Sequence, residues 1–142
     1  MSSEVFTYSF KVAESAIDDL DHVNNLTYLQ WCLEAAEKHW ITLSDPDMRA
    51  HFAWIVLKHE IDYRGAALLG DELQMETWVN WSRGAKSERA YRIVHTTDNR
   101  TLVEARTLWC LIDRSNGRPV KIPGDILNLF HNTSADEENS SS

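Results

Sequence analysis

One long amphipathic helix, predicted over about residues 25–41, constrains the fold of this chain more than any other feature. Apolar and aromatic side chains recur there every three or four residues while polar ones fill the opposite side, as in a helix that buries one face. The stripe contains Tyr28, Trp31, Cys32, Ala35, Ala36, His39, Trp40 and Leu43. The helix would measure roughly 25 Å, and the Ser-Asp-Pro-Asp run at 44–47 would end it. The chain therefore needs a long apolar surface against which this stripe packs.

Extended runs supply that surface. Residues 4–13 alternate apolar and polar side chains, which indicates a half-buried strand. Four more runs follow the helix, at about 53–63, 71–82, 87–98 and 101–113. They are longer than the usual five or six residues, so the sheet must twist and curl. This order predicts an α+β fold, in which a curled antiparallel sheet of about five strands wraps around one central helix.

The length of 142 residues and the composition predict a single domain over residues 1–131. The stretch 132–142 is rich in Ser, Asp, Glu and Asn, has almost nothing to bury, and is expected to be a disordered tail. One helix covers only one face of five strands, so we expect a sheet edge or the outer face to contact a second copy of the chain.

The formal net charge of -8 argues against broad binding to nucleic acid, whose phosphates require a basic face. No apolar run approaches the ~18 residues of a membrane span, and the first residues lack the basic and apolar regions of a secretion signal. We therefore expect a soluble, cytoplasmic protein without a membrane partner. Cys32 and Cys110 have no CxxC spacing and are interpreted as buried thiols, and the six histidines show no metal-ligand spacing, so no metal site is expected.

Chemically useful side chains concentrate just before the helix, where three acids and His22 lie between Ser15 and Tyr28. The first N–H groups of a helix have no partner within it and carry partial positive charge, so they can polarise a carbonyl oxygen. A carboxylate a few residues upstream can act as a general base on water. A structural alternative stands beside this one, because Asp and Asn before a helix are also ordinary caps.

The run Asp18-x-x-x-His22-Val-Asn-Asn-x-x-Tyr28-x-x-Trp31 resembles the signature of hot-dog-fold acyl thioesterases, in particular the 4-hydroxybenzoyl-CoA thioesterase-like and acyl-ACP thioesterase-like families. Residues 61–73 and 109–123 resemble later family segments in order and spacing, so the resemblance covers about residues 5–127. It implies a hot-dog fold that hydrolyses an acyl-CoA or acyl-carrier-protein thioester. It also implies a site between the subunits of a homodimer or homotetramer. Coenzyme A enters only as part of the substrate or product, not as a cofactor.

The resemblance implies roles for single residues. Asp18 would be the general base on water, or the nucleophile that forms an anhydride, and the backbone N–H of Asn25 would polarise the thioester carbonyl. His22 and Asn24 would shape the pocket or orient water, although a capping role suits His22 equally. Tyr28 would line the acyl tunnel together with Trp31, but the place of both residues on the apolar stripe favours the core.

Two departures from the family patterns favour a mechanism centred on Asp18. The plant-type acyl-carrier-protein pattern has Asn where this chain has Leu20, and its catalytic Glu corresponds to Ala66. Both substitutions argue against an Asn-His-Glu set.

The phosphates of coenzyme A call for local cations. The best candidates are Arg83, Lys86 and Ser87, in a basic cluster that ends at Arg89, with Arg64 as another. The alternative is that this cluster has no binding role, because hairpin turns are often rich in Lys and Arg. Two other functions remain open: a hot-dog hydratase or dehydratase, and a noncatalytic acyl-thioester-binding or regulatory protein.

Overall fold

A computed structural model describes residues 4–131, and the predicted tail at 132–142 lies outside the described residues. The elements in chain order are β1 (Phe6–Lys11), a 3-10 turn η1 (Glu14–Ala16), α1 (Asn25–Leu43), α2 (Pro46–His51), β2 (Phe52–Tyr63), β3 (Glu72–Arg83), β4 (Lys86–His95), β5 (Arg100–Asp113), β6 (Arg118–Pro119) and α3 (Gly124–Phe130).

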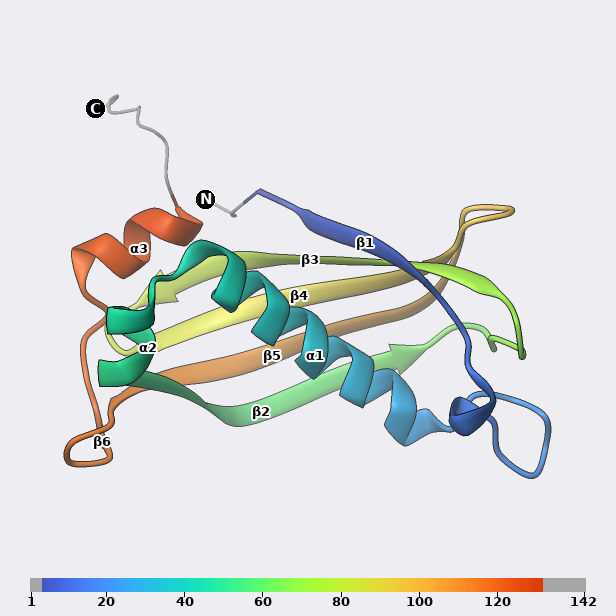
Figure 1. Ribbon diagram of the computed structural model, residues 1–142, viewed down its shortest axis with the longest axis horizontal. Helices are drawn as coiled ribbons and strands as arrows, with labels where there is room; N and C mark the ends of the chain where they lie inside the picture. The colour runs from blue at the N-terminus through green and yellow to red at the C-terminus, as the bar shows by residue number, and fades with distance from the viewer. Residues whose placement is uncertain (1–3, 132–142) are drawn as a thin grey trace.

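The strands form one antiparallel sheet in the order β1-β3-β4-β5-β2, with the short β6 paired to β5. Helix α1 lies across one face of this sheet, and β1 and β2 form its two edges (Figure 1). The pairing register shifts once in the β2–β5, β3–β4 and β4–β5 ladders. Such irregularities increase the local twist, which lets these long strands curve around the helix. The predicted α+β architecture is confirmed.

The element boundaries differ from the sequence prediction at several places. The first strand covers Phe6–Lys11 rather than 4–13, and the run predicted at 87–98 ends at His95 because the chain turns there, with Asn99 at a φ of 58°. Helix α1 continues to Leu43, and the segment that ends it also begins α2. There the Asp45 side chain accepts a hydrogen bond from Met48 N at 2.7 Å. Among the described residues, no helix is both long enough and apolar enough to cross a membrane.

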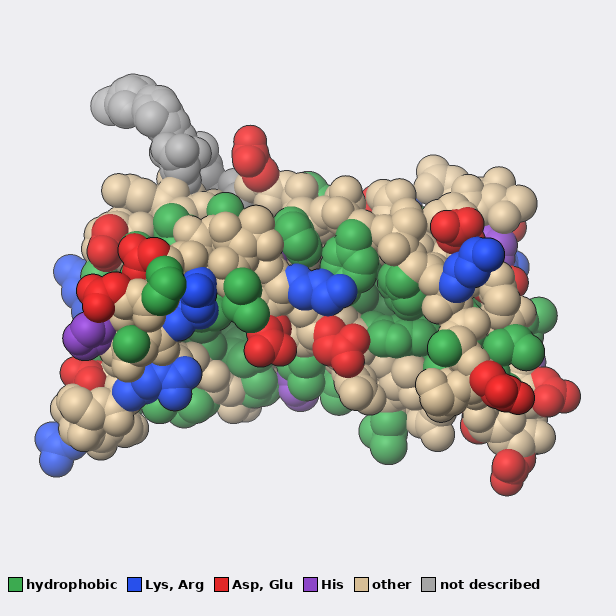
Figure 2. Space-filling model, viewed as in Figure 1, with side chains coloured by type: hydrophobic (Ala, Val, Ile, Leu, Met, Phe, Trp, Pro, Cys, Tyr) green, Lys and Arg blue, Asp and Glu red, His purple; other side chains and the backbone are tan. Residues whose placement is uncertain are grey.

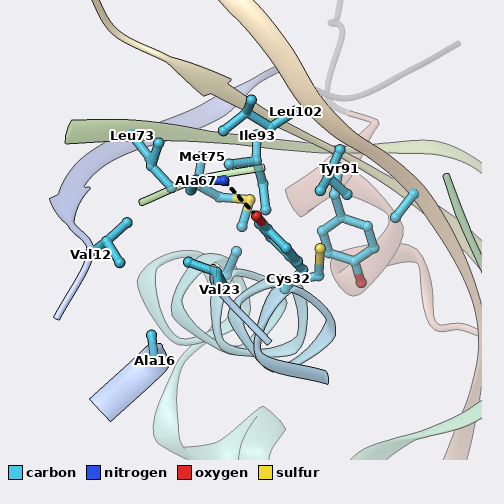
Figure 3. Close-up of a cluster of buried hydrophobic side chains, with 14 of the residues drawn as sticks. Val12, Ala16, Val23, Cys32, Ala67, Leu73, Met75, Tyr91, Ile93 and Leu102 are labelled. Carbon is cyan, nitrogen blue, oxygen red and sulfur yellow. Dashed lines mark hydrogen bonds between the residues drawn. The ribbon is translucent and has the colours of Figure 1, made fainter. Parts of the chain in front are cut away.

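The larger of two buried clusters lies under the N-terminal half of α1. Figure 3 shows Val23 and Cys32 facing Leu73, Met75 and Ile93 of the sheet. Tyr28 is 2% exposed, and its hydroxyl accepts a hydrogen bond from the buried Ala67 N–H at 2.9 Å. The second cluster packs α3 onto the opposite end of the sheet, around Val79, Leu111, Ile122, Ile126 and Phe130.

Replacing Tyr28 with Phe is expected to lower the free energy of unfolding by about 1–3 kcal/mol, because the buried Ala67 N–H loses its acceptor. Urea denaturation measures this change. Tyr63→Phe is the matched control, since the Tyr63 hydroxyl donates to Asn25 O in an exposed setting and its loss should change the stability little. Equal losses in the two variants would contradict the importance of the buried bond.

Candidate active site

The segment that carries Asp18 is a tight loop beside the start of α1 (Figure 1). Ile17 and Val23 form an antiparallel bridge across it, and Asp18 N donates to His22 O at 2.8 Å. Asp21 has a φ of 64°, a conformation that Asp tolerates better than most residues. Val23 N then donates to Ala67 O at 3.2 Å, which ties the loop to the segment between β2 and β3.

The Asp18 carboxylate is half-buried and has one oxygen engaged. Its Oδ1 accepts hydrogen bonds from Leu20 N at 2.9 Å and from His22 N at 3.3 Å. No group of the described residues donates to Oδ2. The loop therefore holds the carboxylate in place through one oxygen and leaves the other for a water molecule or a substrate carbon.

Asn24 is the N-cap of α1, and its side chain accepts a hydrogen bond from Leu26 N at 2.8 Å. Thr27 N donates to Asn24 O at 2.9 Å. Within residues 4–131, no group accepts a hydrogen bond from the backbone N–H of Asn25. The cap thus satisfies the neighbouring amides and leaves Asn25 N–H as a donor at the positive end of the helix dipole.

A cleft of about 380 Å³ brings these groups together. It is lined by Asp18, Leu20, His22, Val23, Asn24, Asn25, Tyr28, Gly65 and Ala66. Burial raises the pKa of Tyr28 above its usual value, so its phenol stays protonated in the wall of the cleft. The structure therefore places Asp18, His22 and Asn25 in one cavity, with Tyr28 both in its wall and in the core. In the described part of the chain, no group of three His, Cys, Asp or Glu side chains is arranged to hold a metal ion.

The cations predicted to bind the phosphates of coenzyme A do not gather at the Asp18 cleft. Arg64 adjoins Gly65 of the cleft, but its guanidinium forms an ion pair with Glu104 at 2.8 Å. Arg83 and Lys86 lie at the hairpin between β3 and β4, near the opposite end of the sheet (Figure 1). Helix α1 separates the two ends, and its 19 residues span about 28 Å. Within one chain, Arg83, Lys86 and Ser87 do not reach the Asp18 cleft.

Arg89, assigned from the sequence to the basic cluster, is a buried residue. It is 5% exposed and shares the face of β4 toward α1 with Ser87 and Tyr91. Its Nη1 donates to His39 Nδ1 at 2.9 Å and to Thr77 Oγ1 at 3.1 Å. The alternation of Ser87, Arg89 and Tyr91 in the sequence was the available signal for this orientation.

The burial of His39 predicts that the stability of the fold depends on pH. Burial, with the Arg89 charge, lowers the pKa of His39 from 6.5 to about 4. Below pH 6.5 His39 therefore becomes protonated in the unfolded chain but stays neutral in the folded chain. The free energy of unfolding consequently falls as the pH drops toward 4. The contribution of His39 is about 3 kcal/mol. We expect His39→Gln, which keeps an acceptor for Arg89, to reduce the loss of unfolding free energy between pH 7 and 4 by that amount. Identical pH profiles of the two proteins would contradict this.

An apolar edge strand is the remaining surface feature. β2 lies at one edge of the sheet and exposes Ile55, Val56 and Leu57, by 42%, 37% and 47%. Hydrophobic side chains are visible along the lower border of the space-filling view, where Figure 1 places β2 (Figure 2). A long apolar edge of this kind is a surface that proteins normally cover.

Comparisons with known proteins identify the family and the fold. The thioesterase-like superfamily matches residues 12–130. Among solved structures, the chain is similar to a 1,4-dihydroxy-2-naphthoyl-CoA thioesterase from Synechocystis, with a TM-score of 0.81 and 22% identity over 92% of this chain and 98% of that one. The probable thioesterase YbaW from Escherichia coli gives a TM-score of 0.78 and 25% identity over 87% of this chain and 94% of that one.

A hypothetical protein from Staphylococcus aureus, solved in complex with CoA, gives a TM-score of 0.82 and 13% identity, over 92% of this chain and 84% of that one. A comparison with curated proteins finds no match. The similarity to these structures confirms the predicted hot-dog fold.

Proposed function

The chain belongs to the thioesterase-like superfamily, and we propose that it hydrolyses an acyl thioester to a free carboxylic acid and a thiol. The observation that carries the proposal is the meeting of the Asp18 carboxylate and the Asn25 N–H in one cleft. Coenzyme A is the favoured thiol carrier, because a structural neighbour is described as a CoA thioesterase and another was solved with CoA.

The Asn25 N–H would receive the carbonyl oxygen of the thioester. As the carbonyl carbon becomes tetrahedral, negative charge develops on that oxygen, and the unpaired amide with the helix dipole stabilises it. One such donor is typically worth ~10²–10³ in rate. Asn24 positions this donor by capping the helix, so its side chain acts on the reaction through Asn25.

Asp18 would act through its Oδ2. As a general base it removes a proton from the attacking water, the C–S bond breaks, and the proton passes to the leaving thiolate. As a nucleophile it bonds to the acyl carbon and expels the thiolate, leaving an acyl anhydride; water then cleaves the anhydride, which restores the Asp18 carboxylate and supplies a proton to the thiolate. His22 stands at the exposed rim of the cleft, where it would orient water or substrate.

A homodimer formed along β2 would complete this site. Antiparallel pairing of two β2 strands about a two-fold axis sets the Phe52 end of one strand beside the Tyr63 end of the other. The Tyr63 end lies at the cleft, because the Tyr63 hydroxyl donates to Asn25 O at 3.1 Å.

The basic hairpin at Arg83–Lys86 joins β3 to β4, and β4 is separated from the edge strand β2 only by β5. Lys86 pairs with Cys110 of β5, and Cys110 pairs with Ile55 of β2. Neighbouring strands are about 4.8 Å apart, so the hairpin is about 10 Å from the edge. Each cleft would then face the Arg83–Lys86 hairpin of the other subunit, where cations could meet the phosphates of coenzyme A.

A panel of acyl-CoA and acyl-carrier-protein thioesters, varied in chain length, tests the proposal through the release of free thiol. We expect turnover of at least one thioester in the panel. Loss of the enoyl absorbance of crotonyl-CoA without thiol release would instead indicate a hydratase. Tight binding of acyl-CoA without turnover, under conditions where a known thioesterase works, would indicate a binding protein.

A further inference from the structure

A second cavity, of about 310 Å³, lies between the C-terminal half of α1 and the sheet. We call it the Arg89 cavity. Its walls include the aromatic side chains of Trp40, Trp54, Trp109 and Phe130 and the buried polar side chains of Ser87 and Arg89; the exposed Arg114, whose Nε donates to Arg49 O and Phe52 O, also borders it. It shares no lining residue with the Asp18 cleft. The volume corresponds to about ten groups the size of a water molecule.

The cavity contains a positive charge without a negative partner. In the described part of the chain, no Asp or Glu forms an ion pair with Arg89; its Nη1 donates to the neutral acceptors His39 and Thr77. Glu37, the carboxylate in the lining, is exposed and is not paired with Arg89. Burial lowers the pKa of Arg89 to about 10, so the guanidinium is still charged at neutral pH.

A buried charge is costly unless an opposite charge and hydrogen bonds compensate it. The two bonds from Nη1 leave the Nε and Nη2 hydrogens of the guanidinium for another acceptor. The buried indole N–H of Trp109, another lining residue, also forms no well-aligned hydrogen bond. A carboxylate supplies both the negative charge and the paired oxygens that a guanidinium binds best.

We propose that the Arg89 cavity binds a carboxylate attached to an apolar body, with the carboxylate on Arg89 and the apolar body between the aromatic side chains. Two sources have this chemistry. One is a free carboxylic acid. The other is the distal carboxylate of an acyl group whose thioester lies in the Asp18 cleft of the other subunit of the proposed dimer, because Ala53 and Trp54 of the cavity lie at the Phe52 end of β2. Binding of the free acid does not depend on the proposed hydrolysis, whereas the second source rests on it.

Octanoate, which has ten non-hydrogen atoms, is a suitable probe, and 1-octanol is its neutral counterpart. We expect octanoate to bind at one site per chain, about tenfold or more tighter than 1-octanol, by calorimetry and by tryptophan fluorescence. Arg89→Met should remove this preference and Arg89→Lys should keep part of it. Arg92→Met is the matched control, because Arg92 lies on the outer side of the same strand, paired with Glu76 at 3.3 Å, and should change nothing.

Equal binding of octanol and octanoate, or unchanged octanoate binding in Arg89→Met, would overturn the proposal. Ala53→Phe tests it without touching Arg89, because Ala53 lines the cavity and a larger side chain would fill it. This variant should lose octanoate binding, and full retention would also overturn the proposal.

Hydrolysis distinguishes the two sources. If the cavity holds a distal carboxylate, suberoyl-CoA should be cleaved with a higher kcat/KM than octanoyl-CoA, and Arg89→Met should abolish the difference. If octanoate binds but suberoyl-CoA is not cleaved in preference to octanoyl-CoA, the cavity is a site for free carboxylic acids. A protein that cleaves no thioester but binds octanoate through Arg89 would refute the proposed function and leave this site standing.

Discussion

Asp18→Asn is expected to lower kcat by ~10² or more, with little change in the fold. The side chain of Asn keeps the Oδ1 that accepts the N–H groups of Leu20 and His22, so the loop beside α1 should retain its shape. The substitution removes the negative charge from Oδ2, the oxygen available to take a proton or attack the carbonyl carbon. The measurement is steady-state thiol release, with circular dichroism to check the fold.

Asp19→Asn is the matched control. Asp19 is the next residue in the same loop and is exposed, and it does not line the cleft, so its kcat should stay within a few-fold of the wild type. A wild-type rate in Asp18→Asn, or equal losses in both variants, would exclude Asp18 as the base or nucleophile.

Leu57→Glu is expected to convert a dimer into monomers and to remove most of the activity. Leu57 lies in the apolar stretch of β2, and a charge there would be buried against its own copy in the proposed interface. The separated subunits would each lose the basic hairpin of the other. Analytical ultracentrifugation measures the assembly and thiol release measures the activity.

Ile41→Glu serves as the control for this substitution. Ile41 is also apolar and is 49% exposed, but it lies on α1 and not on the edge strand. It should leave both assembly and activity unchanged. A wild-type protein that is monomeric and active, or a Leu57→Glu variant that remains a fully active dimer, would contradict the β2 interface.

The sequence predicted most of the fold because its periodicities are strong. The stripe from Tyr28 to Leu43 has helical spacing, and the extended runs at 53–63 and 71–82 are bounded by turn residues, which indicates strands. Helix α2 was missed because Asp45 and Pro46, which indicate the end of α1, also start the next helix. Such a short helix leaves almost no periodic signal.

The candidate site was predictable where it is local in sequence. Asp18, His22, Asn24 and Asn25 fall within eight residues, so one loop and one cap bring them to the same cleft. The contact of Arg89 with His39 joins residues 50 positions apart, and such a contact depends on how α1 crosses the sheet. A side chain counted as a surface cation therefore proved to be buried.

The proposed reaction is cleavage of the C–S bond of an acyl thioester with water. The most direct test is hydrolysis of an acyl-CoA in water enriched in heavy oxygen, with thiol and acid measured together. We predict equal amounts of free coenzyme A and free acid, with the heavy oxygen in the carboxylate of the acid. No thiol release above the uncatalysed rate across the acyl-CoA and acyl-carrier-protein panel would show that the protein is not a thioesterase.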